Sequence, residues 1–343
     1  MKNQNNKREQ MQILRVGTFN LFQFVEPPYS WYTKKETFSI VKWQEKISWI
    51  KKQILEMDCD IIGFQEVFSK DALEKLTKEL GFDYFVTVDN AKVDKQDPHI
   101  FISTTVALAS KYPILEVQEV PIDQKSILNH KYEGTFKFSR VPIKALIKLP
   151  NEKKITVYVN HFKSNRLNEL EYSFSENHTL IEKKNKTKQA LEENLSKALK
   201  QRLCETSSLF YDFQNTTTPI ISICDLNDKE FSLTIEALSN KSYHDNNPKD
   251  SYILYDVYNL YDKKIYNPHP EQKKIKRTAT SYFEGCGNVL DYIFVSKEFN
   301  KKEKNAIGKI NSYEIFDKHF YNNQHGSLIQ SDHAQVVCEI EFY

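Results

Sequence analysis

Ser331-Asp332-His333 runs directly into Ala334-Gln-Val-Val-Cys-Glu-Ile-Glu-Phe342, so that a polar triplet precedes an apolar, strand-like segment. Three earlier segments of this kind also end in polar residues: Gly17-Thr-Phe-Asn20, Asp60-Ile-Ile-Gly-Phe-Gln-Glu66 and Ile223-Cys-Asp-Leu-Asn227. Each strand-like segment is apolar, and each ends in a side chain that can hold a metal or a proton. Four such endings in one chain indicate that distant segments converge on a single polar site.

The composition is that of a large globular protein. A chain of 343 residues that is 40% hydrophobic can bury a sizeable core, as one large α/β domain or two smaller ones. No long linker rich in Pro, Gly or Ser is present, which favours one domain over residues 13–343, preceded by a polar N-terminal tail at residues 1–12. The formal net charge is only +2, so any affinity for nucleic acid has to come from a local patch.

The cysteines and the N-terminus bear on the cellular environment. The five cysteines are scattered and show no C-x-x-C spacing, which argues against a zinc site and a disulfide framework. The N-terminus has no apolar segment typical of a signal peptide, and no run approaches the ~20 apolar residues of a membrane span. We therefore expect a soluble protein without a transmembrane segment, either cytoplasmic or exported without a conventional signal peptide.

Strand-like and helical segments alternate along the chain, which predicts a layered α/β architecture. Helices are expected near 41–57, at 70–80 with Gly81 closing the helix, and across 183–209, where Leu191, Leu195, Ala198, Leu199 and Leu203 form one apolar stripe. Strands are expected at or near 13–20, 61–64, 82–88, 105–109, 113–120, 141–148, 155–160 and 220–224.

Two polar segments interrupt this pattern, at 241–250 and 263–277. The second is strongly basic and has two interpretations, a solvated surface loop or a loop that attracts phosphate beside the active site. The histidines outside the polar motifs, among them His130 and His244, show no metal-ligand spacing and are expected in surface positions or loops.

The polar motifs, taken in order, resemble those of the endonuclease/exonuclease/phosphatase superfamily, the fold of deoxyribonuclease I. The motifs are Asn20, Gln65-Glu66, His161-Phe-Lys-Ser164, Asp225-x-Asn227, Leu290-Asp291-Tyr-Ile293 and Ser331-Asp332-His333. One motif alone is weak, whereas six in the family order over residues 13–342 are strong. The resemblance implies a four-layer α/β (α+β) sandwich, in which two packed, mainly antiparallel β-sheets are flanked by helices.

Within that superfamily, the chain is most similar to bacterial nuclease-like members, as judged from residues 160–166 and 287–296. The inositol polyphosphate 5-phosphatase branch carries a tryptophan and a glycine just before its D-x-N motif, where this chain has Ile223-Cys224. The abasic-site branch carries an acidic residue two positions after the first-strand asparagine, where this chain has Phe22. These departures favour a broader nuclease or another phosphodiesterase.

The resemblance also implies a metal site. Glu66 would be the principal ligand, and Asn20 and Asp332 would complete the shell directly or through water. A sparse shell of oxygen ligands suits Mg²⁺ better than Zn²⁺, with Mn²⁺ able to substitute.

The remaining motif residues would carry the chemistry and bind the substrate. By resemblance, Asp291 orients His333, which handles a proton of the attacking water or of the leaving oxygen. His161 would donate to a non-bridging phosphate oxygen, Asp225 would position or deprotonate the nucleophile, and Asn227 would bind a phosphate oxygen. Whether Asp225 or His333 is the general base stays open. The basic residues expected to contact substrate phosphates are Lys163, Arg166 and Arg140.

The leading hypothesis is a magnesium-dependent phosphodiesterase that hydrolyses DNA, with RNA as a further substrate and no obligate protein partner. The alternative keeps the scaffold but takes a membrane lipid, as in sphingomyelinase-like or phosphoinositide-directed members. The aromatic loop Phe22–Tyr32, with Phe24, Tyr29, Trp31 and Tyr32, would then enter the membrane interface or else pack on the domain. A third, disfavoured reading is an inactive module that binds nucleic acid or protein.

Overall fold

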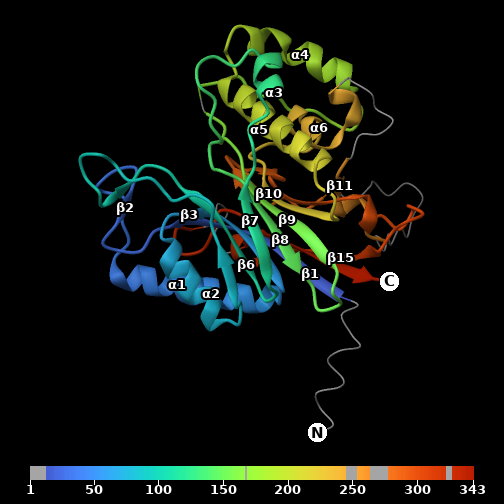
Figure 1. The fold of residues 1–343 in the computed structure, drawn as a ribbon. Helices are drawn as coiled ribbons and strands as arrows, with labels where there is room; N and C mark the ends of the chain where they lie inside the picture. Colours follow the sequence, from blue (N-terminus) through green and yellow to red (C-terminus); the bar gives the residue numbers. More distant parts are fainter. Residues whose placement is uncertain (1–12, 167, 245–252, 263–276, 322–326) are drawn as a thin grey trace.

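Two six-stranded β-sheets packed against each other form the centre of the molecule (Figure 1). The structure, a computed structural model, describes residues 13–166, 168–244, 253–262, 277–321 and 327–343. The predicted tail, residues 1–12, lies outside the described residues. None of the helices in these ranges combines the length and the apolar character needed to cross a membrane.

The first sheet has the strand order β15-β16-β1-β3-β6-β4. Its strands are β1 (Ile13–Phe24), β3 (Ile61–Val67), β4 (Tyr84–Val86), β6 (Thr105–Ser110), β15 (Gly308–Phe316) and β16 (Gln335–Phe342). The pair β1/β3 is parallel and the remaining neighbours are antiparallel.

The second sheet has the order β11-β14-β10-β9-β8-β7. Its strands are β7 (Ile114–Glu119), β8 (Ile143–Lys148), β9 (Lys154–His161), β10 (Ile220–Asp225), β11 (Tyr255–Asp256) and β14 (Asp291–Val295). The pair β9/β10 is parallel and the remaining neighbours are antiparallel. Two small sheets join β2 (Ser30–Trp31) to β5 (Ile100–Phe101) and β12 (Ser281–Phe283) to β13 (Cys286–Asn288).

The alternation of apolar residues along these strands explains the core between the sheets. Inward-facing side chains such as Val16, Ile61, Val159 and Ile223 are fully buried in one cluster. Gly63 on β3 lets the two sheets approach closely, because a Cβ atom at this position would lie 2.7 Å from Cγ2 of Ile223.

Helices cover the outer faces of both sheets and complete the four layers, which confirms the predicted fold class. Helices α1 (Ile40–Met57) and α2 (Lys70–Glu79) bury apolar side chains against the first sheet. Helix α5 (Lys197–Gln214) places Leu209 and Phe213 against the second sheet. Around α5 pack α3 (Gln124–Asn129), α4 (Leu180–Glu192) and α6 (Leu233–Ser239). Short 3₁₀ helices are η2 (Lys241–Tyr243), η3 (Val257–Asn259), η4 (Lys297–Phe299) and η5 (Lys318–Phe320).

The single helix predicted over 183–209 was wrong, because the chain breaks into α4 and α5. Asn194 has a left-handed backbone with φ of 56°, and the backbone N–H of Leu195 donates to the carbonyl of Ala190, which together end α4. Leu195, assigned to the apolar stripe, is 45% exposed as a result. The helix predicted at 70–80 is confirmed, and Gly81 follows it with φ of +88°.

Candidate active site

The two parallel strand pairs bring the predicted polar residues together. In the first sheet, Asn20 on β1 lies opposite Gln65 on β3, next to Glu66. In the second sheet, Asp225 on β10 lies opposite His161 on β9 on one side and Asp291 on β14 on the other. The register therefore places His161, Asp225 and Asp291 in one row across three strands, with the packed first sheet beside them.

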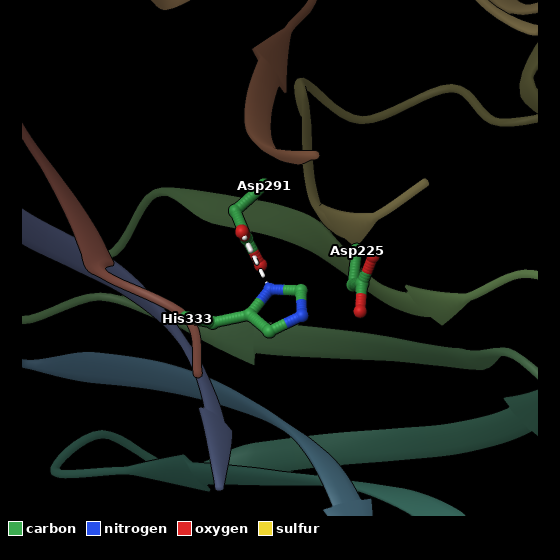
Figure 2. Close-up of side chains that lie close together, drawn as sticks. All are labelled: Asp225, Asp291 and His333. Carbon is green, nitrogen blue, oxygen red and sulfur yellow. Dashed lines mark hydrogen bonds and ion pairs between the residues drawn. The ribbon is translucent and has the colours of Figure 1, made fainter. Parts of the chain in front are cut away.

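His333 joins this row from the segment before β16. Its Nδ1 lies 2.8 Å from Oδ2 of Asp291, and its backbone N–H donates to Oγ of Ser331 over 3.0 Å. The Oγ of Ser331 in turn donates to the carbonyl of Asn20, which anchors this segment to β1. Figure 2 shows the ring of His333 between the carboxylates of Asp291 and Asp225, all three buried and with ligand atoms within 4.8 Å of one another.

These surroundings favour the protonated form of His333. Burial opposes the charged ring, but the carboxylates of Asp291 and Asp225 outweigh burial and raise the pKa of His333 well above its usual value. An imidazolium has no free lone pair, so His333 is a poor metal ligand in this state. We therefore interpret Asp225, Asp291 and His333 as a proton-handling unit.

The carboxylate of Asp225 accepts two hydrogen bonds at the centre of the site. Its Oδ2 accepts a 2.9 Å hydrogen bond from Nδ2 of Asn20, and its Oδ1 accepts one from the backbone N–H of Asn227. Burial raises the pKa of Asp225 to about 6, although His333 and the two hydrogen bonds oppose the shift. At neutral pH Asp225 is therefore mainly ionised and still basic enough to accept a proton.

His161 lies on the opposite side of Asp225 from Asp291. The Nε2 of His161 is 3.5 Å from Oδ2 of Asp225, and the ring is only 1% exposed. Burial, reinforced by Arg140 and His333, lowers the pKa of His161 well below its usual value, so this ring is neutral. Its Nδ1 has no hydrogen-bond partner among the described residues, which leaves this atom available to a ligand.

Two carboxylates next to the unit fit a metal. Burial raises the pKa of Glu66, and the charge of Asp332 raises it further. The pKa of Asp332 is also raised, first by burial. The Oδ1 of Asp332 is buried without a hydrogen-bond partner in the described part of the chain. Two partly buried carboxylates, one with a buried oxygen that has no partner, form a donor set that a divalent cation would stabilise.

Glu66 is held firmly toward the site. Its Oε2 accepts a 3.0 Å hydrogen bond from the backbone N–H of Gln23, and its backbone is left-handed with φ of 58°. The charges of Asp332 and His333 both act on the pKa of Glu66, Asp332 raising it and His333 lowering it. Asn20 makes two hydrogen bonds here: Nδ2 donates to Asp225 and Oδ1 accepts from the backbone N–H of Phe22.

The predicted substrate-binding residues divide into two groups. Arg140 and Lys163 lie near His161, since the charge of each lowers its pKa, and Arg140 also donates to the carbonyl of Phe162. Nδ2 of Asn227 donates to the same carbonyl over 3.1 Å. Arg166 extends outward with its side chain 58% exposed and lies 3.9 Å from Glu169.

Sequence reasoning missed Lys46, which lies on the buried face of α1 and is fully buried. Its Nζ donates to the backbone carbonyls of Phe22, Leu328 and Gln330 over 2.9, 2.7 and 3.0 Å. Burial lowers the pKa of Lys46 to about 7, although the charges of Glu66 and Asp332 oppose this shift. A lysine on the same helix face as the buried Trp43, Ile50, Ile54 and Met57 is the sequence signal that could have identified it.

The aromatic loop packs mostly on the domain. Phe24 and Trp31 are buried, whereas Tyr29 and Tyr32 are exposed. Tyr32 lies at the site: burial raises its pKa, Glu66 raises it further, and Arg140 lowers it. Of the basic segment 263–277, residues 263–276 lie outside the described residues. Arg277 is buried among Tyr258, Tyr292 and Tyr313 and pairs with Asp256, so it cannot attract phosphate from a solvated loop.

Comparisons with known proteins support the fold. No protein-family model and no curated protein sequence matches this chain. The catalytic domain of human Nocturnin, solved with a bound sulfate anion, has a TM-score of 0.59 and 16% identity, over 98% of this chain and 95% of that chain. TDP2 from D. rerio, complexed with a single-strand DNA product, has a TM-score of 0.53 and 10% identity, over 96% of this chain and 99% of that chain.

A mannosyl-6-phosphatase from Bacteroides thetaiotaomicron has a TM-score of 0.51 and 14% identity, over 96% of this chain and 100% of that chain. Other solved structures with this fold are endonuclease/exonuclease/phosphatase family proteins from bacteria. The chain therefore has the fold of these proteins, in agreement with the resemblance found in the sequence.

Proposed function

We infer that this chain is a metal-dependent phosphoesterase, and we propose that it hydrolyses nucleic-acid phosphodiesters, DNA first with RNA as a further substrate, using Mg²⁺. The observation that carries the proposal is one buried group of side chains from both sheets. In it, Asn20 is hydrogen-bonded to Asp225, and Asp291 is hydrogen-bonded to His333. Such a unit, beside two carboxylates that fit a cation, matches the needs of water attack on an anionic ester.

Glu66 and Asp332 would hold the metal, with Asn20 contributing through water. Mg²⁺ fits better than Zn²⁺ because the donors are oxygens and no described cysteine is among them. When bound, Mg²⁺ supplies charge stabilisation for the phosphate oxygens during attack.

The pKa values of Asp225 and His333 suggest how the proton work is divided. Asp225, with a pKa raised to about 6 by burial, is ionised at neutral pH and would accept a proton from the attacking water. His333, whose pKa is raised well above its usual value, would enter the reaction protonated and donate to the leaving oxygen. Neighbouring groups with distinct protonation states are typical of acid–base sites.

The phosphate would lie on the side of the site where His161, Arg140 and Lys163 gather. The unpartnered Nδ1 of His161 can donate to a non-bridging oxygen in the appropriate tautomer. Arg140 and Lys163 add positive charge near this ring. Arg140 and Lys163 would neutralise charge on the ester, and the neutral His161 would donate a hydrogen bond to it.

The phospholipid alternative has less support. Of its aromatic anchors, Phe24 and Trp31 are buried, which leaves Tyr29 and Tyr32 to meet a membrane. The inactive-module reading is disfavoured because Glu66, Asp225, Asp291 and His333 are all present and gathered at one site.

The test is a substrate panel of supercoiled plasmid, single-stranded DNA, RNA, sphingomyelin and phosphoinositides. Wild type and Asp225→Asn are compared in Mg²⁺ and in EDTA. We expect wild type in Mg²⁺ to cleave DNA, and EDTA or the substitution to abolish cleavage. Hydrolysis of a lipid without cleavage of nucleic acid would favour the alternative, and no hydrolysis of any substrate would overturn both.

A further inference from the structure

A second cavity lies among the helices over the outer face of the second sheet. Its volume is about 650 Å³, and its lining comes from α3, α4, α5, α6, η2 and their ends. Figure 1 shows α3 to α6 grouped together above the sheets. No residue assigned to the active site lines this cavity. Its size falls in the range of roughly 300–1,000 Å³ that is usual for small-molecule sites.

The lining combines apolar side chains with planar rings. Leu191, Leu203 and Leu233 supply the apolar part. Nε2 of His130 lies 3.0 Å from the hydroxyl of Tyr243, and Nδ1 of His130 lies 2.7 Å from the carbonyl of Ser126. A carbonyl can only accept, so Nδ1 of His130 donates and Nε2 accepts from Tyr243. These two hydrogen bonds fix both rings in place.

Two lysines give the cavity a positive charge. Nζ of Lys184 donates to the carbonyl of Tyr243 over 3.0 Å and lies 4.7 Å above the Tyr243 ring. Lys200 is only 5% exposed, and its Nζ donates to the side-chain oxygen of Asn194 and the carbonyl of Lys131. Within the described ranges, neither ammonium lies within 4.0 Å of a carboxylate. Both charges therefore lack an anionic partner.

The histidines of the cavity respond to these charges. Burial lowers the pKa of His130, and Lys184 and Lys200 lower it further. Burial lowers the pKa of His244 to about 4, with smaller lowering by His130 and Lys184. The two ammonium groups, which have no carboxylate within 4.0 Å among the described residues, make their part of the lining positive, and the lining also includes the carboxylates of Glu133 and Glu192. His130 and His244 follow α3 and η2 in non-helical segments, as expected, and are partly buried there.

We propose that this cavity binds a small organic phosphate that carries a planar ring, the chemistry of a nucleoside monophosphate. Among the described residues, two ammonium protons of Lys184 and one of Lys200 have no protein acceptor. The phosphate would therefore lie between these two side chains and accept from them. The ring would pack against Tyr211 or Tyr243 over the leucines. Glu133, which is also in the lining, accepts from Nδ2 of Asn194.

The test measures binding without turnover. Titration calorimetry is run in EDTA on an Asp225→Asn background, with adenosine monophosphate, adenosine and inorganic phosphate as probes. We expect adenosine monophosphate to bind at least about tenfold more tightly than either fragment, because phosphate and ring each contribute. Lys184→Met should weaken its binding by about tenfold or more, whereas Lys125→Met, exposed on α3 outside the cavity, should leave it unchanged. Thermal melts of both variants verify folding.

Two results would overturn the proposal. One is that adenosine monophosphate does not bind. The other is that binding survives Lys184→Met and is lost in Arg140→Met, which would place the nucleotide in the active site. Because catalysis is silenced in every sample, the outcome is independent of whether the enzyme cleaves DNA.

Discussion

The amide Nδ2 of Asn20, on the first sheet, donates a 2.9 Å hydrogen bond to Oδ2 of Asp225, on the second sheet. Asn20 lies on β1 and Asp225 ends β10, so this bond ties the acceptor of the proposed proton transfer to the opposite sheet. The bond favours the ionised form of Asp225, whose pKa burial would otherwise raise further. The position of the general base therefore depends on how the two sheets pack.

Asn20→Asp should move the acid limb of the pH–rate profile. The substitution replaces the amide donor with a second carboxylate, which raises the pKa of Asp225 above about 6 and lowers kcat near neutral pH. The measurement is kcat/KM against pH for wild type and variant. An unchanged acid limb would show that Asn20 does not act on Asp225.

His333 should titrate at unusually high pH in the metal-free protein. Its folded pKa is raised by Asp291 and Asp225 despite burial, so its contribution to stability is complete below pH 6.5 and is lost as pH rises through the folded pKa. NMR titration of the His333 ring gives this pKa directly. Asp291→Asn should bring the pKa down, and a wild-type pKa at or below 6.5 would contradict the role given to Asp291.

Mg²⁺ or Mn²⁺ should raise the melting temperature. Asp332 raises the pKa of Glu66, and Asp225 and Asp291 raise the pKa of Asp332; a bound cation would offset this repulsion and stabilise the native state by mass action. Scanning calorimetry at increasing Mg²⁺ measures the shift, and Glu66→Gln should largely abolish it. If the wild-type melting temperature is insensitive to millimolar metal, these residues do not form a metal site.

Lys46→Met should destabilise the fold strongly. The substitution removes the Lys46 donor from the part-buried carbonyls of Phe22, Leu328 and Gln330, and a fully buried unsatisfied group of this kind costs roughly 1–3 kcal/mol. Lys46→Arg keeps a donor and should recover part of the loss. Lys52→Met on the same helix, with its side chain 75% exposed, is the matched control. Urea unfolding compares the variants, and equal stability of Lys46→Met and Lys52→Met would refute the structural role.

The polar residues that the structure gathers at the candidate site could be picked out from the sequence, because their residue types and their order along the chain need no coordinates. The parallel pairing of β1 with β3 and of β9 with β10 then follows from the fold that the resemblance implies. Tertiary contacts were harder to foresee. Asn194 breaks the helix predicted over 183–209 through a left-handed backbone, which propensity alone does not reveal. The burial of Lys46 was not foreseen, because its ammonium group is accepted by three backbone carbonyls that are remote in sequence.

The most direct test of the central claim is a double-mutant cycle on the best substrate of the panel, with Asp225→Asn, His333→Gln and the double variant. If both residues act on the same phosphate, each single change should lower kcat by about 10³-fold or more, and the double variant should be little worse than either. Independent losses that multiply in the double variant, or single variants that retain near wild-type kcat, would contradict a shared proton-handling unit.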